Sequence, residues 1–291
     1  MDYIKTLRNN NKILSETRAH RFQTQSTSDF SIRFALTGNE SYRLGRRELS
    51  VYPDSFLILN KGTQYISKID SNTPVESFAL TFDQHFLADF NRSYTLSDVS
   101  LLDEPQHGAG LGFGMDFNET IYPFAGDMLF NVNHLKNNLD NGLQDELLIN
   151  EYLNHCLINY YRIYKNEVDN KVDKLNFSSQ STKIEILKRL NLAKDYMYSN
   201  YNKNIALDDL AKHACLSVNH LLRTFKQAFS LSPHQFLIQL RLQRAKMLLK
   251  TTHYSINEVV CMVGFECPSS FIRLFKGKYK TTPMKYRQAA A

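Results

Sequence analysis

Apolar side chains recur at helical spacing in the C-terminal third of the 291-residue chain. The segment "LDDLAKHACLS" carries them at Leu207, Leu210, Ala211 and Ala214. This three-and-four spacing places them on one face of a short helix. A second apolar row begins after Ser217, which stands where a helix N-cap is expected. The pattern predicts a short helix, a tight turn and a second helix.

The same pattern returns about fifty residues later. Phe225, Phe229, Pro233 and Phe236 recur at an offset of 50 as Phe275, Tyr279, Pro283 and Tyr286. Upstream, "INEVVCMVGFE" matches the first segment at an offset of 49. In this copy Gly264 supplies a permissive backbone for the turn, and Pro268 suits the first turn of the helix that follows. The chain therefore contains two predicted helix-turn-helix units.

The second helix of each unit, at about 218–228 and 269–278, has two different faces. The inward positions are Leu221, Phe225 and Ala228, and then Phe271, Leu274 and Phe275. The outer rows place an aliphatic side chain beside an arginine, which suits the major groove of DNA because thymine presents a methyl group there and guanine two acceptors. We predict base contacts at Val218, Asn219, Leu222, Arg223, Pro268, Ser269, Ile272 and Arg273. We predict phosphate contacts at Lys226, Lys276, Ser217 and Ser270.

Between the two units, residues 234–250 contain neither glycine nor proline and are rich in helix-forming residues. Seventeen helical residues span about 25 Å. With the thickness of the flanking units added, two recognition helices would lie about one DNA turn, roughly 34 Å, apart. One chain could then read two successive major grooves.

Charge separates the chain into two parts. Residues 183–291 hold 18 Lys and Arg against 6 Asp and Glu, a net charge of +12, whereas residues 1–182 carry −6. Such a basic segment indicates nucleic acid or an anionic membrane as a partner. No apolar run reaches the roughly 20 residues that a membrane span needs, and the polar N-terminus lacks a secretory signal, so a cytoplasmic protein without a membrane partner is expected.

From about Lys183 to Arg287 the chain resembles the DNA-binding domain of AraC/XylS-type bacterial transcription regulators. The motifs that carry this resemblance are Arg241-Leu242-x-x-Ala245, Gly264-Phe265 and Pro283-x-x-Tyr286-Arg287. The resemblance implies seven helices, the first over 183–202, with double-stranded DNA and RNA polymerase as partners. Ser230 and Lys280 depart from it, since the family has glycine there. Either the turn differs, or these residues tolerate a strained backbone.

Short alternating runs between Ser31 and Phe82 predict strands of a compact β-barrel or sandwich. Residues 48–69 resemble the cupin half-barrel that precedes the DNA-binding domain in many of these regulators. Such barrels enclose ligand-sized cavities, so a small-molecule effector is expected as a partner. The candidate pocket residues are Arg33, Tyr42, Arg43, Tyr52 and Tyr65, each of which could equally be an ordinary surface residue.

Residues 143–164 predict a helix with a broad apolar stripe that includes Leu148, Tyr152, Cys156 and Tyr160. The stripe is wider than packing on one barrel requires. Two explanations stay open: the helix packs on the barrel, or it is shared with a second subunit in a homodimer, as the family resemblance implies.

The predicted fold is therefore an α+β multidomain protein, with an N-terminal cupin-like β-barrel that includes helices and a C-terminal all-α domain of about seven helices. We predict an effector-binding and dimerisation domain at 1–165, a linker at 166–182 and a double helix-turn-helix domain at 183–291. The predicted function is sequence-specific DNA-binding transcription regulation, as an activator.

Two alternatives belong to other classes. A cupin-type metalloenzyme or sugar-binding module with a basic tail would use the barrel, but His-x-His is absent and His20, His85 and His107 are scattered. We therefore predict no catalytic residue, metal or cofactor. The other alternative is a basic domain that binds protein instead of DNA. The four cysteines have no CxxC spacing and are expected to be small buried residues in a reducing compartment.

Overall fold

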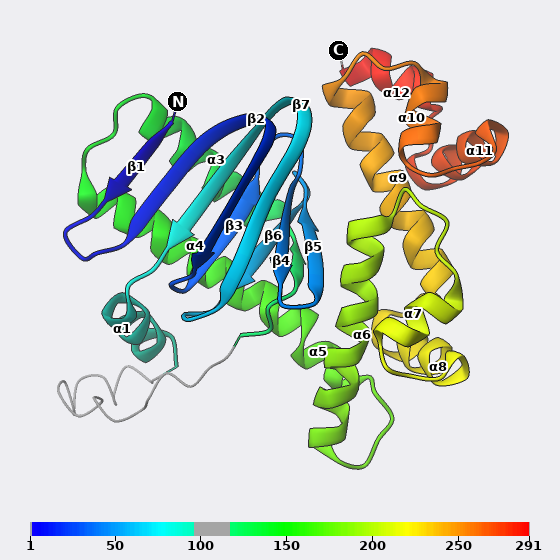
Figure 1. Cartoon of the computed structure of the whole chain (residues 1–291), viewed down its shortest axis with the longest axis horizontal. Coiled ribbons are helices and arrows are strands. Elements are labelled where there is room, and N and C mark those ends of the chain that lie inside the picture. Colours follow the sequence, from blue (N-terminus) through cyan, green and yellow to red (C-terminus); the bar gives the residue numbers. More distant parts are fainter. Residues whose placement is uncertain (1, 96–116, 291) are drawn as a thin grey trace. The chain divides into compact units, whose positions relative to one another are not determined.

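The computed structural model describes residues 2–95 and 117–290, apart from the side chains of Thr95 and Ala290. Contacts divide the chain into two compact units, Met1–Glu167 and Val168–Ala291. We call them the sheet domain and the helical domain (Figure 1). The segment 166–182, predicted as a linker, contains the end of α4 (Glu146–Glu167), a short helix α5 (Asp169–Asp173) and the start of α6 (Gln180–Asn200). The predicted fold class, a sheet-rich N-terminal domain followed by a helical domain, is confirmed.

In its described residues, the sheet domain contains one antiparallel sheet of eight strands. Its strands are β1 (Tyr3–Thr6), β2 (Lys12–Thr27), β3 (Ser31–Ala35), β4 (Glu40–Leu44), β5 (Arg47–Val51), β6 (Ser55–Leu59), β7 (Gln64–Thr81) and β8 (Ile121–Pro123). The order is β1-β2-β7-β3-β6-β8, and β4 pairs with both β5 and β7. Because β1 and β8 are the two ends of this order, the sheet does not close into the predicted barrel.

Strands β2 and β7 form a long antiparallel pair that the alternation of side chains does not predict in full. Strand β7 runs over 18 residues and continues through Pro74, whereas the sequence predicts only short strands between Ser31 and Phe82. Strand β2 was not predicted, because from Arg18 onward most of its side chains are polar and partly or fully exposed, which removes the period of two. A register shift occurs between Arg18 and His20, and His20 has a positive φ of 63°.

Helices α3 (Gly126–Asp140) and α4 (Glu146–Glu167) lie along one face of the sheet, and α1 (Gln84–Thr95) lies beside its end (Figure 1). The core beneath them is aromatic, with Phe34, Phe56 and Tyr122 of the strands and Tyr160 of α4 fully or almost fully buried. Packing on the sheet thus explains the inner part of the α4 stripe.

The helical domain follows the expected succession of seven helices after α5. They are α6 (Gln180–Asn200), α7 (Leu207–His213), α8 (Val218–Phe229), α9 (Pro233–Thr251), α10 (Ile256–Met262), α11 (Pro268–Tyr279) and α12 (Pro283–Ala290). Helix α9 contacts α8 on one side and α10, α11 and α12 on the other, so it connects the two helix-turn-helix units (Figure 1). Ser232 and Ser255 begin α9 and α10 with capping boxes, completed by Gln235 and Glu258.

The cysteine prediction is mostly wrong. Cys156 is buried, whereas Cys215, Cys261 and Cys267 are exposed. Cys215 stands at a turn and Cys267 at a helix N-cap, where helical periodicity does not report burial. Cys261 lies on the face of α10 that does not carry the buried Val259 and Val260. Within the described parts of the chain, no helix is long and apolar enough to cross a membrane.

Candidate nucleic-acid interface and effector site

The first helix-turn-helix unit consists of α7, a tight turn and α8. Leu210 and Ala211 of α7 are buried, as are Leu221, Phe225 and Ala228 of α8. Cys215 makes the turn with a left-handed backbone, φ 51°. Ser217 is the N-cap of α8, and its hydroxyl accepts a hydrogen bond of 3.3 Å from the His220 backbone N–H. The predicted inward face and cap are confirmed.

The second unit, α10 to α11, repeats this arrangement. Val259 and Val260 of α10 and Phe271 and Phe275 of α11 are buried, while Leu274 is only half-buried. Gly264 occupies the position of Cys215 and has a φ of 81°. Pro268 is the first residue of α11, as its missing amide donor predicts.

The predicted DNA-reading side chains lie on the faces opposite these cores. Those of α8 comprise exposed Asn219, Arg223 and Lys226, with Val218 and Leu222 half-buried beside them. Those of α11 comprise exposed Pro268, Ser269, Ile272, Arg273 and Lys276, with Ser270 half-buried. Each helix therefore presents an open row of a polar side chain, an arginine and a lysine, accompanied by an aliphatic residue.

The segments after α8 and α11 resolve the question raised by the two missing glycines. Ser230 and Lys280 have left-handed backbones, φ 58° and 61°, and their amides donate to Lys226 O and Lys276 O. The turn geometry is therefore kept and the strain is tolerated. Aromatic contacts repeat around both turns, with ring centroids 5.6 Å apart for Phe225 and Phe236 and 5.9 Å for Phe275 and Tyr286.

Three of the predicted effector residues come together in the sheet domain. The Arg33 guanidinium donates to the Tyr65 hydroxyl at 3.1 Å and lies over the Tyr65 ring, 5.3 Å from its centroid. The Tyr42 ring is 5.9 Å from that of Tyr65, and burial, followed by nearby Glu40, raises the pKa of Tyr42 well above its ordinary value. These side chains pack against one another.

The other two predicted effector residues do not join this cluster. Arg43 is exposed, because it points to the opposite side of β4 from Tyr42. Tyr52 lies between β5 and β6, where its backbone N–H donates to Ser55. The five residues therefore do not line one pocket.

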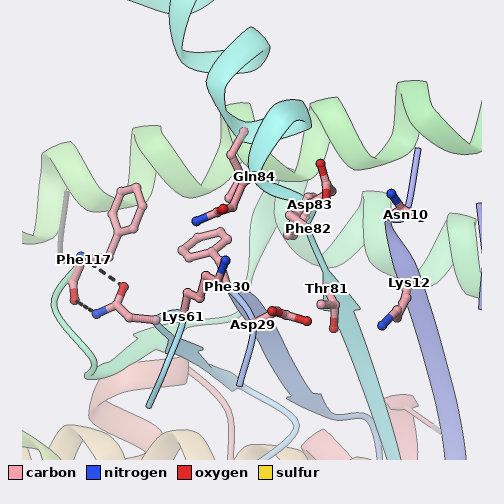
Figure 2. Close-up of a pocket in the computed structure, with 12 residues that line it drawn as sticks. Asn10, Lys12, Asp29, Phe30, Lys61, Thr81, Phe82, Asp83, Gln84 and Phe117 are labelled. Carbon is pink, nitrogen blue, oxygen red and sulfur yellow. Dashed lines mark hydrogen bonds between the residues drawn. The ribbon is translucent and has the colours of Figure 1, made fainter. Parts of the chain in front are cut away.

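A separate cavity of about 490 Å³ opens where α1 meets the ends of the strands. Its rim is charged, with Lys12, Asp29, Lys61 and Asp83, and its wall is aromatic, with Phe30, Phe82 and Phe117. Figure 2 shows Gln84 reaching from α1 toward Phe30, with Lys12 and Phe117 at opposite sides. Sequence reasoning missed this site because its residues stand in turns and at strand ends, where no periodicity connects them.

The predicted dimer helix needs a correction. Cys156 and Tyr160 are 0% exposed, because they belong to the core between α4 and the sheet, and they are therefore not available to a second subunit. Leu148 is 36% exposed and Tyr152 is half-buried. More open apolar side chains nearby are Leu147 of α4, 83% exposed, and Phe130 of α3, 67% exposed.

Among the described residues, no group of three or more His, Cys, Asp or Glu side chains is placed to hold a metal ion. His20 lies in the β2 bulge and His85 in α1, while His107 lies outside the described residues.

Two family models match the chain. A helix-turn-helix domain matches residues 210–289, and an AraC-like ligand binding domain matches residues 13–112. The two matched stretches together cover more than half of the chain.

Relatives include a raffinose operon transcriptional regulatory protein of Pediococcus pentosaceus, 26% identical over 80% of this chain and 74% of that protein. A lactose operon transcription activator of Staphylococcus xylosus is 25% identical over 53% of this chain and about half (51%) of its own length. Among solved structures, the DNA-binding domain of AdpA in complex with a target DNA is 28% identical, with a TM-score of 0.34 over 35% of this chain and 91% of that one.

Proposed function

Because the chain belongs to the AraC/XylS family of bacterial transcription regulators, we propose that α8 and α11 are the two helices that read its DNA target. The chain is a DNA-binding transcription regulator. The observation that carries the proposal is the repeated row on these helices. Asn219, Arg223 and Lys226 recur as Ser269, Arg273 and Lys276, all exposed, while the opposite face of each helix is core.

The roles follow from the chemistry of each side chain. Arg223 and Arg273 each present a planar fork that pairs with the two acceptors of guanine, and Leu222 and Ile272 offer aliphatic contacts for thymine methyl groups. Lys226 and Lys276, one turn further along, bind phosphates and release counterions. Ser217 is the N-cap of α8 and Ser270 stands in the first turn of α11, and the free amide groups at these helix N-termini favour a phosphate.

The spacing supports two successive grooves. Helix α9 has 19 residues. At 1.5 Å per residue it is about 28 Å long. With the helix-turn-helix units at its two sides, a separation near one DNA turn, roughly 34 Å, follows.

We further propose an activating role, in agreement with the name of the Staphylococcus xylosus relative, and hence a contact with RNA polymerase. The dimer we propose forms through the outer side of α3 and α4, where Phe130, Leu147 and Leu148 expose apolar surface.

For the effector, the 490 Å³ cavity is a better candidate than the Arg33 cluster, because its size is in the range of small-molecule sites and its mostly polar lining, with three phenylalanines, suits a polar ligand that stacks on aromatic rings. The names of two relatives connect them with raffinose and lactose operons, so these two sugars are the first probes. Binding should be detected by calorimetry and abolished by Asp29→Ala with Lys61→Ala. Equal binding by this double variant and by the unchanged chain would place the sugar elsewhere.

The central test uses a duplex selected from a random DNA pool with the full chain. Arg223→Ala and Arg273→Ala should each weaken binding to it by roughly 1–3 kcal/mol. Lys226→Ala and Lys276→Ala should each lower the slope of log K against log salt by about 0.9. Arg46→Ala, which removes the same charge from an exposed position of the sheet domain, is the control. If both arginine variants bound as tightly as the control, the assignment of α8 and α11 would be wrong.

A further inference from the structure

The connection between α6 and α7, residues 201–203, lies against α9. Arg241, near the middle of α9, donates from Nε to the Tyr201 carbonyl at 2.7 Å and from a terminal nitrogen to the Lys203 carbonyl at 2.8 Å. These are short, charge-assisted hydrogen bonds from one rigid guanidinium fork. Arg241 thus fixes the stretch of chain that leads directly into the first helix-turn-helix unit.

The same connection touches the turn of the second unit. A Cβ atom added to Gly264 would lie 2.7 Å from the Asn202 carbonyl oxygen and 2.8 Å from the Asn202 carbonyl carbon and Cα. The two backbones are therefore in direct contact, which only glycine permits. The next residue, Phe265, lies beneath the Arg241 guanidinium, 5.8 Å from ring centroid to Cζ.

These contacts unite three parts of the helical domain. Arg241 belongs to α9, residues 201–203 to the entry of the first unit, and Gly264 with Phe265 to the turn of the second unit. Burial lowers the pKa of Arg241, and the neighbouring carboxylate of Glu266 in the second unit opposes this shift. The charge of Glu266 thus adds to the attraction between Arg241 and the second turn.

We propose that Arg241 is a positioning residue that sets the separation and rotation of α8 relative to α11, and thereby the half-site spacing that the regulator accepts. The inference rests on the proposed function, in which both helices read major grooves. Helix α9 contacts α8 of the first unit and α10 and α11 of the second. The junction of Arg241, Asn202 and Gly264 adds a second connection, from the entry of one unit to the turn of the other, and so restrains their relative rotation.

Half-site spacing reports such rigidity directly. Each added base pair moves the second half-site by about 3.4 Å and rotates it by about 34°. A rigid pair of helices cannot follow this movement without losing contacts at one half-site. In a loosely joined pair the second helix can follow the displaced half-site, so less affinity is lost. The second contact then forms at an effective concentration that the flexible connection sets.

The experiment measures binding to the selected duplex and to versions with one or two base pairs inserted between its half-sites, by fluorescence anisotropy at fixed salt. The unchanged chain should lose about tenfold or more in affinity for the first insertion, because its helices are held in register. Arg241→Ala should lose no more than about threefold, and its affinity for the original duplex should fall about fivefold. Arg241→Lys should be intermediate, because an ammonium group lacks the planar fork. Lys250→Ala removes one exposed charge from the same helix. It should keep the same ratio of affinities for the original and the extended duplex as the unchanged chain.

A merely structural role of Arg241 would lower the fraction of active protein and leave the ratio between the two duplexes unchanged. An unaltered ratio in both Arg241→Ala and Arg241→Lys overturns the proposal. The proposal is also overturned if the unchanged chain binds the duplex with an inserted base pair nearly as tightly as the original duplex. Failure of the proposed function is recognised separately, since Arg223→Ala and Arg273→Ala would then bind the original duplex like the unchanged chain.

Discussion

The two helix-turn-helix units share a backbone and differ in what constrains it. Cys215 and Gly264 occupy the same left-handed turn position, and Ser230 and Lys280 the same position after the second helix. Yet Cys215 is exposed, whereas Gly264 lies against the Asn202 backbone. The left-handed turn is therefore common to both helix-turn-helix units. Glycine is required only in the second unit, because there the turn lies against the Asn202 backbone.

Helix capping differs between the units in a reciprocal way. In the first unit α8 is capped by Ser217, whereas the N-cap of α7, Ala206, has no side-chain acceptor. In the second unit α10 begins with the Ser255 capping box, whereas Cys267 makes no side-chain capping bond at the start of α11. A complete set of caps is thus not needed for the fold, and each unit owes its stability chiefly to its buried aromatic face.

The largest contrast is expected between Gly264→Ala and Cys215→Ala. The first change adds a methyl group that meets backbone atoms at 2.7–2.8 Å and also places a side chain at a φ of 81°. It should lower the free energy of unfolding by about 3 kcal/mol, as overpacking and backbone strain combine. Cys215→Ala should change it by less than about 0.5 kcal/mol, because one non-glycine residue replaces another at an exposed position. Urea unfolding of both variants checks this, and equal losses would contradict the Asn202 contact.

The second contrast concerns the two recognition helices. Arg223→Ala should relax base preference in one half-site and Arg273→Ala in the other, each at a cost of roughly 1–3 kcal/mol. The double variant should show the sum of both losses within about 0.5 kcal/mol, because distant sites act independently. Selection of DNA by each variant, followed by sequencing, identifies the half-site affected. Loss of preference at the same half-site in both variants would show that one helix alone reads bases.

Periodicity and the internal repeat predicted the helical domain closely. Local spacing predicts which residues are buried, because the apolar positions of an amphipathic helix mark the face that packs on the core. It predicted the buried residues Leu221, Phe225, Phe271 and Phe275 and the cap Ser217. The exposure of Arg223 and Arg273 follows from the same rule.

Features that depend on distant parts of the chain were not predictable. The approach of Asn202 to Gly264 joins residues more than sixty positions apart, and no pattern within either segment reports it. Strand β2 is extended because it pairs with β7, although its second half has no alternation. The burial of Cys156 and Tyr160 was ambiguous for a related reason, since an apolar stripe does not specify whether its own sheet or a second subunit covers it.

A third contrast comes from the helix caps. Ser217→Ala should cost about 1 kcal/mol, because the His220 amide loses its acceptor. Cys267→Ser should stabilise the chain by a similar or smaller amount, because a hydroxyl at this N-cap can accept from the first turn of α11. Thermal unfolding of the two variants beside the unchanged chain measures both effects.

The gain from Cys267→Ser should also depend on pH. The Ser269 hydroxyl, 3.3 Å from the Cys267 sulfur, lowers the pKa of Cys267 from its ordinary 9.0 to about 7, and the nearby Ser270 amide adds to this shift without making a capping hydrogen bond. A thiolate whose pKa is lowered by folding stabilises the fold fully above the unfolded value near 9, and this contribution is lost as the pH falls through about 7. The serine variant should therefore gain most at pH 6 and least at pH 9. A gain that does not change with pH would contradict the thiolate.

The smallest effects are expected where the two units agree. Ser230 and Lys280 both hold a left-handed backbone after their recognition helices. Glycine removes that strain but increases the entropy of the unfolded chain, so Ser230→Gly and Lys280→Gly should each stabilise the fold by about 0.5–1 kcal/mol. Because both turns have nearly the same φ and the same hydrogen bond to the residue four positions earlier, the two gains should match and should add in the double variant. Urea unfolding measures them, with Ser230→Ala as the control that keeps the strain. If Ser230→Gly stabilised the fold and Lys280→Gly destabilised it, the lysine would stabilise its turn through a contact of its own, and the two turns would not be equivalent.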